Sequence, residues 1–198
     1  MKIRFIVIIL LLLIFTNLSA FDGKRQGFLL GFGAGFSNIS FKQEIDGNDM
    51  GMDYEKETGF ATDFKIGFAP NNRVEIYYSS QVAWFNITNV YGDEVTISDG
   101  VAAISLSYFT SPRLETIDWC PSFYLSGGLG LSAWNTPYED GSEAWTGSGF
   151  FFGAGYEFSR HYRFSMNVFI NDPSTSFYDS TWTTKSTVLM FTLSGMAF

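Results

Sequence analysis

The side chains able to do acid–base chemistry in this sequence are few, and His161 is its single histidine. A histidine that lies beside a serine and an acid can activate the serine hydroxyl for attack on an ester. The charged neighbours of His161 are Arg160 and Arg163, which supply neither partner. We therefore expect no enzymatic activity and no cofactor.

A second candidate is an acidic segment with the spacing of a calcium-binding loop. Asp46, Asn48, Gly51 and Glu57 occupy the first, third, sixth and twelfth places of that pattern. Met50 stands at the fifth place, where calcium needs an oxygen ligand. A solvated acidic loop explains the match better, so no metal site is predicted. Divalent cations are kept only as candidate partners of the acidic loops.

Charged residues also interrupt alternating apolar segments, where they would face a closed interior: Asp63, Lys65, Glu75, Glu157 and Arg163. Charges removed from water must pair to offset the cost of burial. A four-residue turn at Ser159–Tyr162 would set Glu157 directly across from Arg163. We predict that these two form a cross-strand ion pair and that Lys65 reaches diagonally toward Glu75. Such charges could serve a proton or substrate path, but we favour a structural polar plug.

Eight segments of strand length would position these residues, because bulky apolar residues alternate in them with Gly, Ser or a charge. The expected strands are Gly27–Phe41, Gly59–Ala69, Val74–Phe85, Gly100–Thr110, Ser122–Ala133, Gly147–Phe158, Arg163–Asn171 and Ser186–Phe198. Their connections are alternately long and short. This rhythm predicts an all-β fold, an eight-stranded antiparallel up-and-down transmembrane β-barrel.

The Phe-rich face of these strands is expected to contact lipid. The opposite face is mostly Gly, Ala and Ser, which fit a crowded lumen, whereas a soluble barrel would present Lys, Glu and Thr to water. Ten residues at roughly 3.3 Å each, tilted by about 40°, rise about 25 Å, the height of the apolar band in such barrels. Aromatic residues near strand ends are expected in interfacial girdles: Tyr78, Trp84, Tyr108, Trp119, Trp134 and Trp145.

The last expected strand departs from this alternation. Leu189, Phe191 and Leu193 are out of phase with Met196 and Phe198. A bulge at Gly195 would restore the phase by inserting one extra residue.

The first 20 residues predict a secretory signal. Lys2 and Arg4 precede the apolar run Phe5–Phe15, and Leu18-Ser19-Ala20 offers a cleavage site. The run is shorter than the roughly 20 residues that a membrane-spanning helix needs. We expect residues 21–198 to form one barrel domain in the outer membrane of a Gram-negative cell.

The two ends of the predicted barrel carry opposite charge. The long loops hold most of the 20 acidic residues of the chain, Asp99 among them, whereas Arg25, Arg73, Arg160 and Arg163 belong to the short-turn end. An acidic rim repels phosphates, which argues against nucleic acid as a partner. Beside anionic lipopolysaccharide, the same rim would recruit divalent cations.

The chain resembles the small eight-stranded outer-membrane proteins, the family of OmpX, the OmpA membrane domain and the opacity-type surface proteins. The resemblance is carried by the stretch from Gly27 to Phe36, the run Gly153–Phe158 before a short turn, and the terminal Phe198. It implies a membrane-anchored barrel with variable surface loops and usually no catalysis. It also implies that Phe198 is part of the signal read by the barrel-assembly machinery.

Three functions stay open from the sequence. We favour a non-catalytic monomer whose acidic loops contact outer-membrane lipid, lipopolysaccharide, ions or an external partner. The last long loop offers the best contact surface, with Phe177, Tyr178 and Trp182. Because eight strands leave no open channel, a pore would have to pass small apolar molecules along Phe109, Phe151 and Phe169. A lipid A-modifying enzyme is the least favoured alternative.

Overall fold

The computed structural model describes residues 25–49, 53–88, 92–111, 120–138, 144–177 and 179–198. The predicted signal at residues 1–20 lies outside this part of the chain, as do Gly51, Trp119 and Tyr178. Within the described ranges, no helix is long and apolar enough to cross a membrane.

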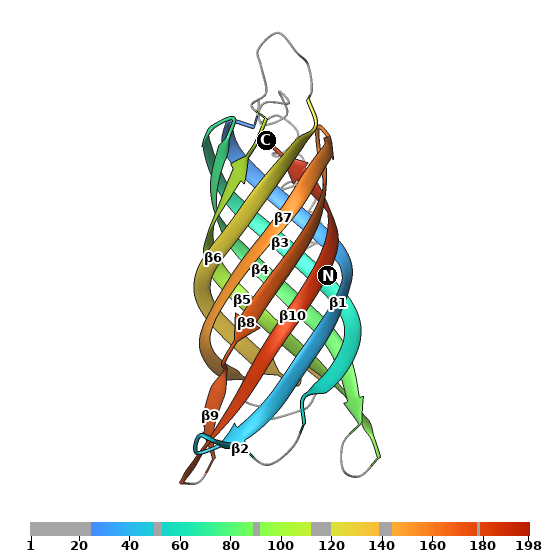
Figure 1. The fold of residues 1–198 in the computed structure, drawn as a ribbon, viewed down its shortest axis with the longest axis vertical. Coiled ribbons are helices and arrows are strands. Elements are labelled where there is room, and N and C mark those ends of the chain that lie inside the picture. The colour runs from blue at the N-terminus through green and yellow to red at the C-terminus, as the bar shows by residue number, and fades with distance from the viewer. Residues whose placement is uncertain (1–24, 50–52, 89–91, 112–119, 139–143, 178) are drawn as a thin grey trace, which may run out of the picture.

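One antiparallel sheet closes on itself to form the barrel (Figure 1). Its long strands are β1 (Gly27–Ile45), β3 (Glu55–Asn71), β4 (Val74–Thr88), β5 (Glu94–Phe109), β6 (Ser122–Asn135), β7 (Trp145–Ser159), β8 (Tyr162–Asn171) and β10 (Ser180–Ala197). The short strands β2 (Asn48–Asp49) and β9 (Ser174–Phe177) extend the long-loop end. The long strands pair in chain order, and β1 pairs with β10 to close the ring. The predicted eight-stranded antiparallel barrel is confirmed.

Several strands run further toward the long loops than the sequence pattern indicates. β1 continues to Ile45, and β5 begins at Glu94 rather than at Gly100. Polar side chains on the outer face of these extensions interrupt the apolar alternation but still pair across strands. Thr96 Oγ1 donates to Asn86 Oδ1 at 2.9 Å, and Ser98 Oγ donates to Asn135 Oδ1 at 2.6 Å.

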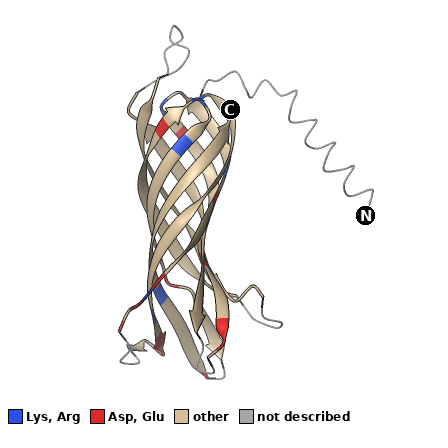
Figure 2. Ribbon diagram, turned by 90° about the vertical axis from the view of Figure 1, so that its right-hand side faces the viewer, with Lys and Arg blue, Asp and Glu red and all other residues tan. Residues whose placement is uncertain are grey.

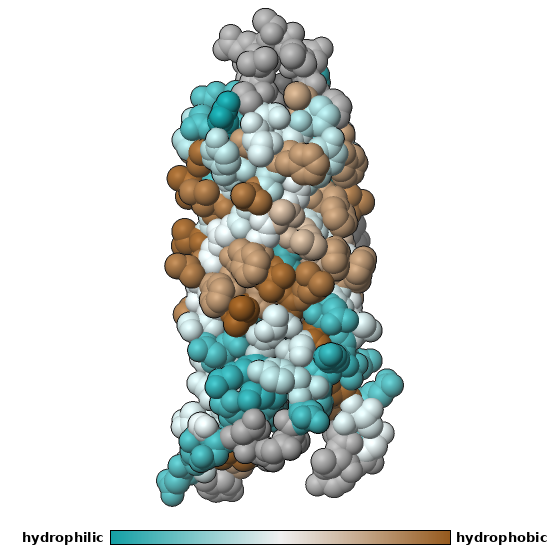
Figure 3. Space-filling model, in the orientation of Figure 1, coloured by the Kyte–Doolittle hydropathy of each residue, from teal (hydrophilic) through white to brown (hydrophobic). Residues whose placement is uncertain are grey.

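A band of bulky apolar side chains surrounds the outside of the barrel. Figure 3 shows it as the brown upper region, above a polar surface toward the long loops. Leu129 and Ile104 are 73% and 69% exposed, and Phe32 and Phe36 are each 62% exposed. Such a surface is stable only against hydrocarbon, because an exposed apolar area of this extent would aggregate in water. The Phe-rich face is therefore the lipid-facing one.

The predicted bulge at Gly195 is wrong. β10 pairs with β1 without a shift through Phe32–Gly195 and Gly31–Met196. Met196 and Phe198 face the lumen and are 4% and 1% exposed, because apolar side chains close the interior at this end. The register shifts instead at Phe68–Asn71 and at Glu157–Ser159, beside two short turns.

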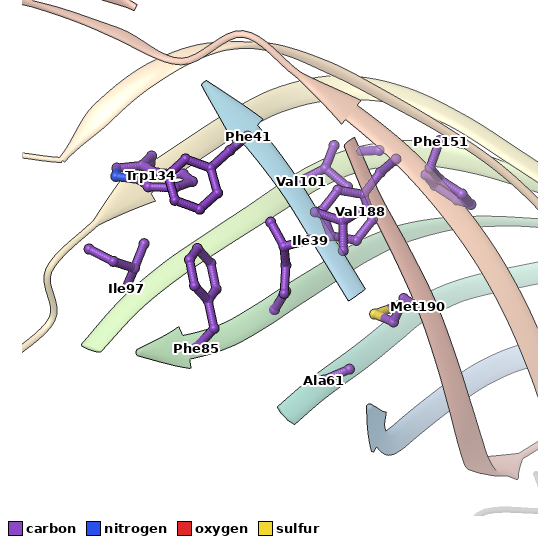
Figure 4. Packing of buried hydrophobic residues seen from close by; sticks show 13 residues of the cluster. Ile39, Phe41, Ala61, Phe85, Ile97, Val101, Trp134, Phe151, Val188 and Met190 are labelled. Carbon is purple, nitrogen blue, oxygen red and sulfur yellow. The ribbon is translucent and has the colours of Figure 1, made fainter. Parts of the chain in front are cut away.

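Apolar side chains also fill the lumen toward the long loops (Figure 4). The ring of Trp134 lies 5.1 Å from that of Phe41 and 5.5 Å from that of Phe85, and Ile39 and Ile97 belong to the same group. We call these five residues the loop-side cluster. Trp145 packs against it. The prediction that Trp134 and Trp145 belong to an outer girdle is therefore wrong.

The outer surface of the barrel thus changes polarity along its axis. Within the lipid-facing band, the outside is apolar, and the lumen holds both charged residues such as Glu75 and Arg163 and apolar ones such as Phe151. Beyond the band, the loop-side cluster is apolar and the outer face carries Asn86 and Asn135.

Candidate functional site

A group of buried ion pairs surrounds Glu157 and Arg163. Figure 2 shows charged residues gathered at the short-turn end of the ribbon. The two residues face each other across β7 and β8, and the register shift at Glu157–Ser159 fits the tight turn that follows. Arg163 Nε donates to Glu157 Oε2 at 3.0 Å. Both side chains are almost wholly buried.

Arg163 also reaches the opposite wall of the lumen. Its Nη1 and Nη2 donate to the two carboxylate oxygens of Glu75 on β4, at 2.9 and 2.6 Å. This fork-to-fork geometry is the strongest form of an ion pair. The predicted contact between Lys65 and Glu75 is wrong, because Lys65 Nζ lies 2.8 Å from Asp63 Oδ2 on its own strand.

Arg25 completes the network, and sequence analysis placed it on the exposed rim instead. Its side chain is fully buried, and its Nε lies 3.2 Å from Glu157 Oε2. Its Nη1 donates to the backbone oxygen of Asn72 at 2.5 Å and to that of Ser111 at 3.4 Å. The balance of charge in the lumen could have indicated the burial of Arg25. Glu75 and Glu157 need two cations between them, and Lys65 pairs with Asp63.

Aromatic rings enclose the two guanidinium groups. Arg25 Cζ lies 4.0 Å from the ring centroid of Phe109, and Arg163 Cζ lies 4.7 Å from the same centroid. Phe198 contributes a third contact, with its centroid 5.0 Å from Arg163 Cζ. Cations over aromatic faces are favoured when water is excluded. The group Arg25, Glu75, Glu157 and Arg163 is called the ionic network below.

The ionic network is suited to closing the lumen rather than to moving protons. Arginine stays protonated in proteins, so a guanidinium cannot pass its proton along a chain. Two arginines and two glutamates balance in charge, and each carboxylate accepts at least two hydrogen bonds. Phe109, Phe151 and Phe169 are all buried in the same lumen.

Asp99 lies inside the barrel and not on a loop as expected from the sequence. It faces the lumen, where Asn171 Nδ2 donates to its Oδ1 at 2.8 Å. Among the described residues, its Oδ2 has no hydrogen-bond partner.

The calcium-like spacing serves a structural contact. Asp46 Oδ1 accepts a hydrogen bond from the backbone N–H of Thr181 at 2.7 Å, and Asp46 N donates to the Thr181 oxygen at 2.8 Å. Asp46 has a φ of 51°, which an aspartate tolerates. Glu57 lies in β3, and Gly51 is outside the described residues. In the described part of the chain, no group of three acids, histidines or cysteines is arranged to hold a metal ion.

His161 fastens the β7–β8 turn to the end of β10. Its Nδ1 lies 2.9 Å from the backbone oxygen of Met196, so Nδ1 is the donor. The backbone N–H of Met196 donates in return to the His161 oxygen at 2.7 Å. The histidine therefore has a positioning contact with backbone atoms.

No protein-family model matches the chain, and no curated protein matches it. Among solved structures, Neisserial surface protein A has a TM-score of 0.52 at 13% identity, covering 85% of this chain and 96% of that one. OprG from Pseudomonas aeruginosa has a TM-score of 0.48 at 15% identity, covering 89% and 98%. Ail of Yersinia pestis, the attachment invasion locus protein, has a TM-score of 0.48 at 12% identity, covering 87% and 99%.

The closed barrel and its apolar band define the class of this protein as a small eight-stranded outer-membrane β-barrel. The fold similarity to Neisserial surface protein A agrees with this class. The strands cross the membrane, and the protein is located in the outer membrane.

Proposed function

We propose that the protein is a non-catalytic surface protein, in which a filled barrel anchors acidic loops at the outer face of the outer membrane. The observation that carries this proposal is the filled lumen. The ionic network occupies the short-turn end, and the loop-side cluster occupies the other end. An interior packed in this way gives the barrel the role of a scaffold.

Planar-bilayer recording tests the scaffold role. Purified, refolded protein should give no conductance steps in salt solution, because an ion would have to displace buried side chains. Regular steps at low voltage would refute the proposal. The Arg25→Ala variant serves as a comparison, since it removes one residue of the network.

The loops offer the contact surface in this proposal. β9 and the start of β10 form a paired hairpin, in which Phe177 is 62% exposed and Trp182 is half-buried. Tyr138 in another long connection is 79% exposed. Exposed aromatic residues held on a rigid hairpin are typical anchors of binding surfaces.

Lipopolysaccharide is the partner that we propose for the outer rim, with divalent cations bridging its phosphates to the acidic loops. Lys185 adds a direct cation: it is half exposed, and its Nζ lies 2.7 Å from Glu44 Oε2. In vesicles that contain lipopolysaccharide, magnesium should raise the unfolding temperature. In phosphatidylcholine vesicles, magnesium should have no effect. Equal effects in both would refute the bridging role.

Passage of small apolar molecules is the second candidate, because the loop-side cluster would solvate them. A molecule that entered there would meet the ionic network below it. Uptake of an apolar dye into proteoliposomes, no faster than into empty liposomes, is therefore expected. Faster uptake that falls when Phe41 is changed to Asp would favour this candidate instead.

The assembly role of Phe198 is also part of the proposal. Its ring lies in the lumen beside Arg163, so the residue contributes to packing as well. Phe198→Ala should lower the assembled fraction in cells by more than it lowers refolding in detergent. Equal losses in both would mean that packing alone explains the effect of the Phe198 substitution.

We also propose that the protein is a monomer, and sedimentation in detergent should give the mass of one chain.

A further inference from the structure

The lipid-facing wall is hollowed near the short-turn end, on the face formed by β1, β3, β8 and β10. The hollow has a volume of about 520 Å³ and is lined mainly by Leu30, Phe32, Phe64, Tyr162, Gly195 and His161. Its lining is largely apolar. A volume in the range of roughly 300–1,000 Å³ is typical of sites that hold a small molecule.

Gly195 is the origin of the hollow. It lies between Phe32 on β1 and Tyr162 on β8 in the cross-strand register, at a position whose side chain would point outward. A Cβ atom added at Gly195 would meet no atom within 4 Å. The missing side chain therefore leaves a gap between two large rings, Phe32 at 62% and Tyr162 at 53% exposure.

Lipid is the medium that faces this gap. An empty apolar hollow loses the dispersion contacts of its lining atoms, so it is more stable when filled. Because the hollow opens within the apolar band, the occupant that fits it is a hydrocarbon chain.

The turn next to the hollow carries a cation that complements a phosphate, Arg160. His161 lines the hollow, and its ring orientation is fixed by the bond between Nδ1 and the Met196 oxygen. Arg160, the preceding residue of the turn, is exposed and adjoins the hollow without lining it. Short turns face the periplasm in outer-membrane barrels, so these two residues lie at the headgroup level of the inner leaflet.

We propose that this hollow binds one anionic phospholipid of the periplasmic leaflet, with an acyl chain over Gly195 and the phosphate beside Arg160. This site extends the proposed function, and it depends on the membrane placement that the proposed function assumes. It gives the barrel a fixed lipid contact at the leaflet opposite its loops.

Native mass spectrometry of the full barrel in mild detergent tests the site, with phosphatidylglycerol and phosphatidylethanolamine added in equal amounts. The wild-type protein should retain one phosphatidylglycerol molecule. Gly195→Leu, which fills the gap, should lower that occupancy about tenfold, since burial of a few methylene groups is lost. Arg160→Gln should reduce the preference for phosphatidylglycerol while binding of a phospholipid persists. Gly195→Ala gives a smaller loss and serves if the leucine variant does not fold.

Gly127→Leu is the matched control, because Gly127 faces the same lipid band on β6 with only the Phe151 oxygen nearby, at 3.4 Å. This variant should retain phosphatidylglycerol. Equal occupancy in Gly195→Leu and the wild type, or equal loss in Gly127→Leu, would overturn the site. Quenching of tryptophan fluorescence by brominated lipids in vesicles checks the membrane placement separately, through Trp84 on the outer face. Failure of that quenching would refute the placement itself.

Discussion

Replacing Arg163 with methionine tests whether the ionic network stabilises the barrel. The change removes three charge-assisted hydrogen bonds, two to Glu75 and one to Glu157. Glu157 keeps Arg25 as a partner, but Glu75 is left buried without the guanidinium that neutralised it. Removing one member of a buried ion pair costs about 3–5 kcal/mol, most of it from the uncompensated charge. We expect the free energy of unfolding to fall by about that amount.

Reversible urea unfolding in lipid vesicles, followed by tryptophan fluorescence, measures this difference. Arg73→Met is the control: Arg73 is exposed at the same end of the barrel, and its Nη1 donates to the Tyr108 hydroxyl at 3.2 Å. Its loss should cost less than about 1 kcal/mol. The double variant Glu75→Gln with Arg163→Met should be more stable than Arg163→Met alone, because it removes the stranded carboxylate.

Two results would contradict this account of the network. One is an Arg163→Met variant within about 1 kcal/mol of the wild type, which would mean that water or a neighbour compensates Glu75. The other is a double variant no more stable than the single one, which would place the cost in lost packing around the Arg163 side chain.

Two further outcomes are expected from the same structure. Arg25→Ala should lower the free energy of unfolding by about 1.5–3 kcal/mol in the same assay, because Glu157 and two turn carbonyls lose a charged donor. Gly35→Ala should lower the refolding yield in detergent, since its Cβ would overlap the Phe191 backbone oxygen, whereas Gly195→Ala should refold normally.

Alternation along the strands was sufficient to predict that a set of charged side chains faces the lumen. Asp63, Lys65, Glu75, Glu157 and Arg163 are all buried. The strand register across a short turn could also be predicted from the sequence, so Glu157 and Arg163 could be placed opposite each other. Both inferences depend on local geometry alone.

Contacts across the lumen could not be predicted in this way. The pairing of Arg163 with Glu75 depends on the tilt of the strands and on the stagger between β4 and β8, which no local pattern encodes. Arg25 precedes β1, so it had no strand register to place it. For Met196 and Phe198, the pattern showed a change of phase, but a bulge and an inward-facing apolar pair produce the same pattern.

The change in polarity of the outer surface along the barrel axis has a consequence for how deep the protein sits in the bilayer. If the barrel moved toward the periplasm, the polar outer face around Asn86 and Asn135 would enter hydrocarbon. If it moved outward, the lipid-facing band would be exposed to water. Both displacements are unfavourable, so the vertical position of the barrel in the bilayer is fixed. In a bilayer of different thickness, the lipids around the barrel would then have to thin or thicken locally, while the barrel kept its vertical position.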